Sequence, residues 1–151
     1  MSYKVDRVKW RGNAAEIKSI REKVFVCEYR IPQFQEFDQN DSNCEHVLIR
    51  DDNGQAIATG RLGSDGKISR IAVLMKYRSS DAAQQVMAQL LAIAKAKGFT
   101  CVSIDSELED VGKYRRQGFE PISGVYMDAG IAKQTLTCPL DKFQCDDNIL
   151  H

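Results

Sequence analysis

The chain has 151 residues, of which 43% are hydrophobic, and this size and composition favour one folded domain with its own core. The number of lysine and arginine residues equals that of aspartate and glutamate residues, at 21 each. The chain therefore has no net positive charge that would attract nucleic acid or an anionic membrane. No segment approaches the roughly 20 apolar residues of a membrane span, and the first ten residues lack the apolar core of a signal peptide, which favours a cytoplasmic protein without a membrane partner.

Alternating apolar residues predict a first strand within "YKVDRVKW" (3–10). Apolar residues at helical spacing predict a helix over 13–29, with Asn13 as its N-cap. The polar stretch 35–45 predicts a loop with one short helical turn. Two short strands around Asn53-Gly54 predict a hairpin within 46–62, and "GKISRIAVLM" (66–75) predicts another strand.

The clearest amphipathic helix spans 81–97, where apolar residues recur on one face and Gly98 follows as the closing residue. "FTCVSIDS" (99–106) predicts a strand in which Cys101 is buried, and "EDVGKYRRQG" (109–118) predicts a short helix. Residues 119–140 predict two strands joined around Asp128-Ala129-Gly130. We expect a single domain over 1–140 and a mobile tail over 141–151, because the tail has no clear period.

The five cysteines form no CxxC pair, and their odd number favours reduced thiols, as in a cytoplasmic protein. The only histidines are His46 and His151, and no spacing of cysteine and histidine suggests a zinc cluster. We therefore predict no metal site.

The order of predicted elements is β-α-β-β-β-α-β-α-β-β, with a short helical turn before the second strand. Runs of adjacent strands favour antiparallel pairing, and the two strands that flank the long helix favour one parallel crossover. The sequence thus predicts an α+β fold, with a mixed, mostly antiparallel sheet and helices on both faces.

Several segments occur in a characteristic order between about Ile20 and Thr137: "REKVFVCEYRIP", "EFDQND", "CEHVLIR", "ATGRL", "ISRIAVLMKYRS", "AKAKGF" and "GKYRRQGFEPISGVYMDAGI". This order resembles the GNAT N-acetyltransferase superfamily, and most closely its small ElaA/YjcF-like branch. The resemblance implies a sheet splayed in the middle, with acetyl-coenzyme A (acetyl-CoA) in the gap. It also implies transfer of the acetyl group to a primary amine by direct attack, without an acyl-enzyme.

The same resemblance implies two sets of coenzyme-binding residues. The strand end Val73-Leu74-Met75 would face the pantetheine arm, and one amide, expected to be that of Val73, would face the acetyl carbonyl. The pyrophosphate loop aligns with Arg78, Ser79, Ser80, Asp81, Ala82 and Ala83. Asp81 replaces a glycine of the family, and its carboxylate both repels a phosphate and is suited to cap the helix. We expect weakened rather than abolished coenzyme binding.

The resemblance assigns Tyr114, in "YRRQGF", as the acid that protonates the departing thiolate. Candidates for the base are Glu28, Glu36, Asp38 and His46, and Glu28 is the one that we place in the catalytic set, beside apolar neighbours. Glu36, Asp38, His46 and Arg61 are expected to contact the acceptor. Two alternatives stay open here: a structural hydrogen-bonding role for His46, and pairing of Arg61 with Glu36 or Asp38.

The acceptor could be a small metabolite, a peptide terminus or a lysine side chain, and a homodimer is left open. The alternative function is a non-catalytic GNAT-fold binding module in which coenzyme binding is weakened or lost. Asp81 favours that module, whereas Tyr114 favours the enzyme.

Overall fold

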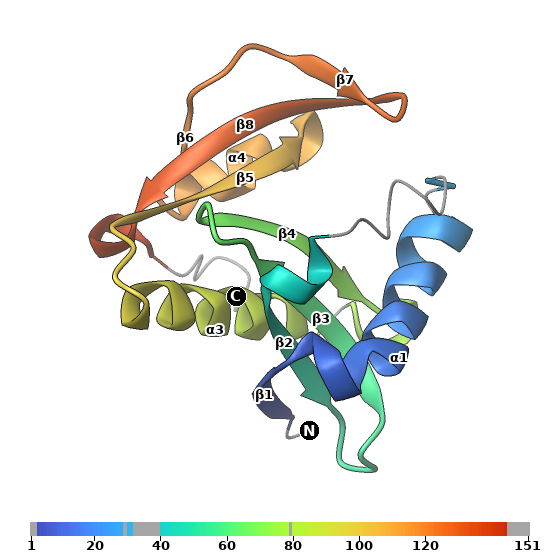
Figure 1. Ribbon diagram of the computed structural model, residues 1–151. Coiled ribbons are helices and arrows are strands. Elements are labelled where there is room, and N and C mark those ends of the chain that lie inside the picture. Colours follow the sequence, from blue (N-terminus) through green and yellow to red (C-terminus); the bar gives the residue numbers. More distant parts are fainter. Residues whose placement is uncertain (1–2, 29, 32–39, 79, 145–151) are drawn as a thin grey trace. The chain divides into compact units, whose positions relative to one another are not determined.

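The computed structural model describes residues 3–28, 30–31, 40–78 and 80–144 (Figure 1). The chain divides into two compact units, an N-terminal unit of residues 1–93 and a C-terminal unit of residues 94–151. No helix in the described ranges has both the length and the apolar composition needed to cross a bilayer.

The N-terminal unit is built on an antiparallel sheet. Its strands lie in the order β1 (Lys4–Val8), β2 (Glu45–Arg50), β3 (Ala56–Leu62) and β4 (Lys67–Val73). The predicted hairpin between β2 and β3 is confirmed. Gly54 adopts a φ of +80° in its turn, and Asp51 Oδ1 accepts the N–H groups of Asn53 and Gln55.

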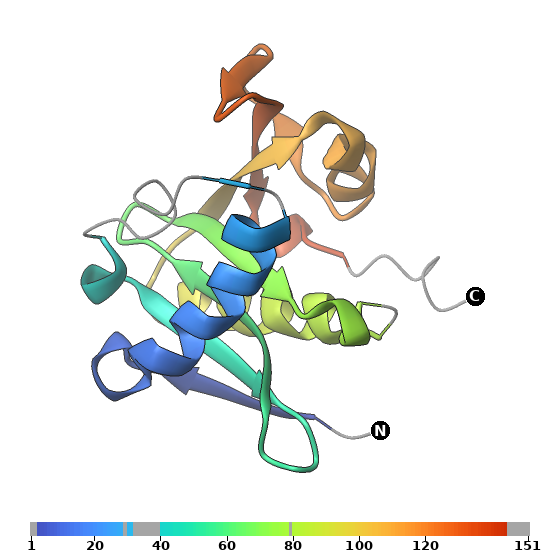
Figure 2. The same ribbon diagram turned by 90° about the vertical axis from the view of Figure 1, so that its right-hand side faces the viewer.

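Helices cover both faces of this sheet, as predicted (Figures 1 and 2). On one face, Ile17 and Ile20 of α1 (Trp10–Arg21) form a buried cluster with Leu48 and Ala72. On the other face lies α3 (Ala82–Ala96), most of which belongs to this unit. A Cβ placed on Gly60 would lie 2.5 Å from Val86 Cγ1, so α3 approaches β3 where β3 has no side chain.

The first helix differs from its prediction at both ends. It begins at Trp10, and a kink at Arg11 and Gly12, where Gly12 has a φ of +94°, precedes Asn13. The predicted N-cap at Asn13 is therefore wrong; its side-chain amide donates across the kink to the Lys9 carbonyl. After Arg21 the chain continues as a π-helical turn, η1 (Glu22–Glu28). The predicted short turn in the polar loop is η2 (Asp41–Asn43).

Strand β4 contains a bulge and ends earlier than predicted. Thr59 pairs with Ala72 and Arg61 with Ser69, so Gly60 alone lies opposite two residues of β4, one of which is Arg70 with a φ of +56°. The strand stops at Val73, because the chain turns into a 3-10 turn, η3 (Met75–Tyr77), which leads toward α3.

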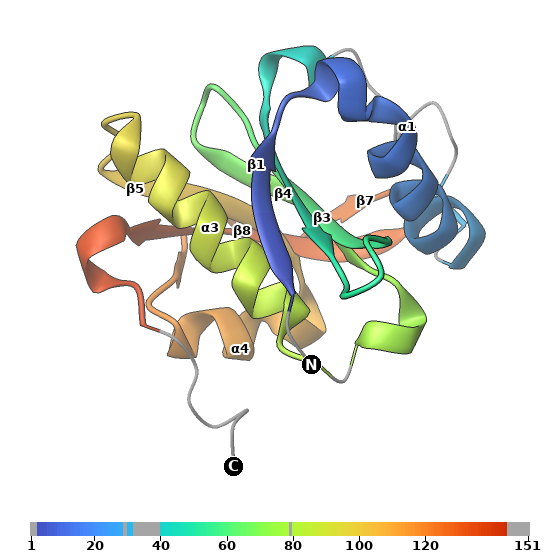
Figure 3. The same ribbon diagram turned by 90° about the horizontal axis from the view of Figure 1, so that it is seen from below.

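The C-terminal unit is a second antiparallel arrangement (Figures 1 and 3). Strand β5 (Cys101–Glu107) pairs with β8 (Ile131–Pro139), which also pairs with β7 (Tyr126–Asp128) and with β6 (Glu120–Pro121). The one strand predicted before the turn at Asp128 is thus divided into β6 and β7. A 3-10 turn, η4 (Leu108–Asp110), leads from β5 into α4 (Val111–Arg116).

The structure corrects one prediction for this unit, the burial of Cys101. Cys101 is exposed rather than buried, because the alternation of β5 turns Val102 and Ile104 inward. After η5 (Leu140–Lys142), the Phe143 ring lies edge-on to Phe119, with centroids 6.4 Å apart. The rest of the predicted tail, from 145 onward, lies outside the described residues.

The predicted parallel crossover and the predicted gap in the sheet both concern β4 and β5. Because these strands belong to different units, both features stay predictions.

Candidate active site

The loop from β4 to α3 is ordered by its own hydrogen bonds. The Leu74 N–H donates to the Ile57 carbonyl (3.0 Å), and the Tyr77 N–H donates to the Leu74 carbonyl (2.8 Å). Successive residues of a strand direct their N–H groups to opposite sides, so the Val73 N–H points away from β3. Of the three predicted strand-end residues, Leu74 has its amide occupied by β3, whereas the Val73 amide is not directed to that strand. The Met75 side chain is 68% exposed.

Tyr77 anchors this loop to the β2–β3 hairpin. Its ring is buried and its hydroxyl donates to Asp51 Oδ2 at 2.8 Å. This hydrogen bond lowers the pKa of Asp51, which stabilises the carboxylate. Sequence reasoning missed both residues, because nothing in the polar turn around Asp51 indicates a distant tyrosine.

The start of α3 involves two neighbouring residues. The Asp81 carbonyl accepts the Gln85 N–H at 3.0 Å, which places Asp81 at the predicted N-cap position. The side chain that accepts a helix-start amide is Ser80, whose Oγ receives the Ala82 N–H at 3.2 Å. The next two amides, those of Ala83 and Gln84, belong to the first turn, where N–H groups have no partner within the helix and favour an anion. Ser79 lies outside the described residues.

Arg78 connects the strand end to the first helical segment. Its Nε donates to the Val73 carbonyl at 3.1 Å. Its Nη2 donates to Glu28 Oε1 at 2.7 Å and lies 2.6 Å from Oε2. The predicted pyrophosphate ligand and the predicted base thus form an ion pair. Both oxygens of Glu28 are therefore already engaged by Arg78.

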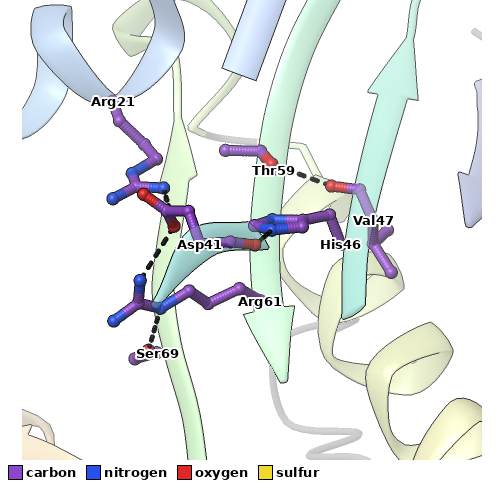
Figure 4. Close-up of polar contacts among 7 residues, drawn as sticks. All are labelled: Arg21, Asp41, His46, Val47, Thr59, Arg61 and Ser69. Carbon is purple, nitrogen blue, oxygen red and sulfur yellow. Dashed lines mark hydrogen bonds and ion pairs between the residues drawn. The ribbon is translucent and has the colours of Figure 1, made fainter. Parts of the chain in front are cut away.

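A buried charge network fixes Arg61 (Figure 4). Asp41 Oδ1 accepts from Arg21 Nη1 at 2.7 Å and from Arg61 Nη1 at 2.8 Å, and Arg61 Nε donates to Ser69 Oγ. All three charged residues are buried. Arg21 opens the segment "REKVFVCEYRIP" and Asp41 closes "EFDQND", so segments that carry the family resemblance meet here.

The network shows a contact of Arg61, a predicted acceptor-binding residue, that the sequence did not predict. The ion-pair partner found for Arg61 is Asp41, which sequence reasoning did not single out, while Glu36 and Asp38 lie outside the described residues. The one sequence signal for Asp41 is its position at the end of "EFDQND", a segment that carries the family resemblance. The geometry supports a positioning role for Arg61, because its guanidinium is directed to Asp41 and Ser69.

His46 is fully buried against the same network. Its Nε2 lies 2.8 Å from the Asp41 carbonyl oxygen, and because a carbonyl only accepts, Nε2 carries the proton. The ring lies 5.2 Å from that of Trp10, centroid to centroid. Burial lowers the pKa of His46, so the ring is neutral. These features support the structural role that the sequence left open.

Tyr114 lies on α4 in the C-terminal unit. Its ring packs edge-on against Phe119, with centroids 5.7 Å apart, and Lys113 Nζ lies 5.4 Å from its centroid. Burial, together with the charges of Asp110 and Glu107, raises the pKa of Tyr114 to about 12. The hydroxyl therefore keeps its proton at neutral pH and can donate it.

Glu107 ends β5, directly before the turn that leads to Tyr114. Its carboxylate, with those of Glu109 and Asp110, forms a group whose nearest oxygens lie within 4.8 Å of one another. Burial raises the pKa of Glu107, and a hydrogen bond with Glu109 and the neighbouring negative charges raise it further. Sequence reasoning missed Glu107, although "ELED" stands directly before the helix. The group contains no histidine or cysteine, and a cluster of carboxylates alone does not indicate a metal.

The comparisons with known proteins agree on one family. Residues 17–140 match the model of the acetyltransferase (GNAT) domain. The chain is 29% identical to YyaT of Bacillus subtilis over 139 residues, which covers 88% of this chain and 93% of YyaT. It is also 29% identical to the uncharacterized N-acetyltransferase YjcF of the same organism over 116 residues, which covers 74% of this chain and 82% of YjcF.

The crystal structure of Escherichia coli ElaA aligns with a TM-score of 0.78 at 20% identity, covering 91% of this chain and 99% of ElaA, which shows a common fold. The fold class and the ElaA/YjcF-like resemblance predicted from the sequence are thereby confirmed. The chain belongs to the GNAT acetyltransferase family, whose members are acyl-CoA-dependent N-acyltransferases.

Proposed function

We propose that this chain transfers the acetyl group of acetyl-CoA to a primary amine by direct attack, in the cytoplasm. The observation that carries this proposal is the segment β5–η4–α4, which holds a proton donor, Tyr114, and a carboxylate of raised pKa, Glu107. A pair of titratable groups with these properties suits a reaction in which one proton is removed and another is supplied. The four described cysteines are free thiols, which is consistent with this compartment.

The β4–α3 loop fits the coenzyme in most respects. The Val73 N–H is directed away from β3 and suits a carbonyl oxygen of the pantetheine arm or the acetyl group. Arg78 and the first amides of α3, including that of Ala83, suit the diphosphate. Ser80 already occupies the Ala82 amide, and Asp81 adds a like charge. Arg78 and the first amides of α3 favour the anion, whereas the occupied Ala82 amide and the Asp81 charge oppose it, so the loop supports binding of reduced strength.

The reaction needs two proton movements. The amine nitrogen forms a bond to the thioester carbonyl carbon and becomes acidic as it does so, and Glu107 accepts the proton that it loses. The C–S bond then breaks, and the thiolate takes a proton from Tyr114. With a pKa of about 12, Tyr114 donates to the thiolate only as the C–S electrons arrive, and it recovers its proton from solvent.

As the base, Glu107 suits the reaction better than the four candidates expected from the sequence. Glu28 is held by Arg78, and His46 is buried with its proton directed to a carbonyl. Glu36 and Asp38 lie outside the described residues. Glu107, in contrast, has its pKa raised toward the working pH, where a general base is most effective.

The test is a turnover assay with acetyl-CoA and three acceptors: a small alkyl amine, a peptide with a free N-terminus and a lysine-containing peptide. We expect Tyr114→Phe to lower kcat by roughly 10²-fold while the Kd for coenzyme A stays unchanged. Tyr126→Phe removes a hydroxyl from another tyrosine of the same unit and should leave kcat near that of the wild type. Glu107→Gln should lower kcat and remove the acidic limb of the pH profile.

The pH profile is a second readout. Since the pKa of Tyr114 is about 12, its ionisation should cause no loss of rate between pH 7 and 10. An unchanged kcat in Tyr114→Phe would mean that Tyr114 has only a packing role. Absence of turnover with all three acceptors, together with no rise in melting temperature on adding acetyl-CoA, would support the non-catalytic binding module instead.

A further inference from the structure

The ion pair between Glu28 and Arg78 joins two segments that are 50 residues apart. Glu28 is the last residue of the π-helical turn η1, and Arg78 directly follows η3. The Glu28 side chain is 25% exposed and that of Arg78 is 37% exposed. The pair therefore lies at the edge of the solvent, where an incoming anion can reach it.

The position of Arg78 does not depend on Glu28 alone. Its Nε donates to the Val73 carbonyl, which anchors the guanidinium to the end of β4. Among the described residues, the contacts of this guanidinium use Nε and Nη2, which leaves the two N–H groups of Nη1 for another acceptor. Loss of the Glu28 contact would thus leave Arg78 at the strand end with more donors available.

A carboxylate and a phosphate offer a guanidinium the same kind of ligand, a pair of anionic oxygens. While Glu28 occupies Arg78, the pair is close to neutral and attracts an anion weakly. The Glu28 carboxylate also repels a second anion nearby. Glu28 therefore opposes any anion that approaches Arg78.

We propose that Glu28 is an internal competitor for Arg78, and that the diphosphate of coenzyme A displaces it on binding. This inference rests on the proposed function, which assigns Arg78 to the diphosphate. Coenzyme binding is then an exchange of one anion for another, and it releases the Glu28 carboxylate and the end of η1. The exchange lowers the apparent affinity for the coenzyme by the free energy of the ion pair that it breaks.

The test compares coenzyme A with acetylpantetheine, which lacks the diphosphate, by calorimetric titration at two ionic strengths. Glu28→Gln keeps the shape of the side chain and removes its charge. We expect it to bind coenzyme A about three- to tenfold more tightly than the wild type at low salt, with a smaller gain at high salt. Its affinity for acetylpantetheine should not change.

A matched control exists on α1, where Glu16 forms an ion pair with both terminal nitrogens of Arg50, one at 2.8 Å. Glu16→Gln removes the same charge from an equivalent pair in the same unit and should bind coenzyme A within twofold of the wild type. Equal or weaker coenzyme A binding by Glu28→Gln would overturn the proposal. So would an equal gain with acetylpantetheine or with Glu16→Gln, because the effect would then not involve the diphosphate at Arg78.

A measurement on the wild-type protein does not depend on how the variants fold. The carboxyl ¹³C resonance of Glu28 should shift on saturation with coenzyme A and stay in place with acetylpantetheine. An unmoved resonance with coenzyme A would refute the exchange.

Different outcomes would refute the proposed function and the proposed exchange. Coenzyme binding with the expected Glu28→Gln gain but without acetyl transfer would refute the enzyme and leave the exchange standing, whereas absence of coenzyme binding in every form would refute both.

Discussion

Ser80 and Asp81 have different effects at the start of α3. Ser80 accepts the Ala82 amide, so an anion that needs this N–H must compete with a neutral hydroxyl. Asp81 occupies the N-cap position through its carbonyl, and its side chain is exposed. The expected conflict between Asp81 and the coenzyme is therefore one of charge, rather than competition for an amide.

This difference predicts the effect of Asp81→Asn, which removes the charge and keeps a residue that favours the N-cap. Two unit charges roughly 5 Å apart repel by about 0.8 kcal/mol in water, so coenzyme A should bind several-fold more tightly at low salt and less so at high salt. Calorimetric titration at two ionic strengths measures this, with Asp52→Asn as the control for net charge. Weaker binding by Asp81→Asn would mean that the carboxylate organises the loop for the ligand.

At the scale of elements, α3 and β3 approach closely at Gly60. A Cβ there would meet Val86 Cγ1 at 2.5 Å and Leu90 Cδ1 at 3.0 Å. Valine is stiff at χ1, so it cannot move aside without strain or a shift of the helix. The close approach depends on the absence of a side chain at this position of the strand.

Gly60→Ala should therefore lower the free energy of unfolding by about 1–3 kcal/mol through overpacking. Gly112→Ala is the matched control, because a Cβ on Gly112 meets nothing within 4 Å, and alanine is the better helix former in α4. Urea denaturation measures both variants. A Gly60→Ala/Val86→Ala double variant should lose less than the two single changes together. If Gly60→Ala is as stable as the wild type, α3 does not approach β3 closely at Gly60.

At the scale of the whole molecule, the buried network makes stability depend on pH. The pKa of His46 lies below its ordinary 6.5 in the folded state, mainly because of burial. The unfolded chain therefore binds more protons than the folded chain as the pH falls below about 6.5. The stabilisation from a neutral His46 is complete above this pH and declines as the pH falls toward the folded-state pKa.

We expect the urea midpoint of the wild type to decrease between pH 7.5 and pH 5.0. His46→Gln, which keeps an N–H donor and does not titrate, should show a smaller decrease over the same interval. His151→Gln removes the other histidine and should behave as the wild type does. Parallel decreases in the wild type and in His46→Gln would mean that other groups set the pH dependence.

The sequence by itself determined the features that depend on local chemistry. The β2–β3 hairpin, the span of α3 and its glycine end, and the β5–α4 segment all follow from turn residues, apolar period and helix stops within a few residues of one another. The family could also be identified from ordered segments. The sequence did not determine which face of β5 carries Cys101 into the core or into solvent. An alternating strand has two faces, and only packing decides which one is buried.

Only the tertiary structure decided which charged groups meet. Arg21 and Asp41 are 20 residues apart, Asp41 and Arg61 another 20, and Glu28 and Arg78 are 50 apart. Spacing along the chain places a side chain on a face of its own element, but the partner across the fold depends on how the elements pack. For this reason the sequence indicated the residue types of the site. The structure showed that Glu28 is paired with Arg78, that His46 is buried, and that Glu107 has a raised pKa.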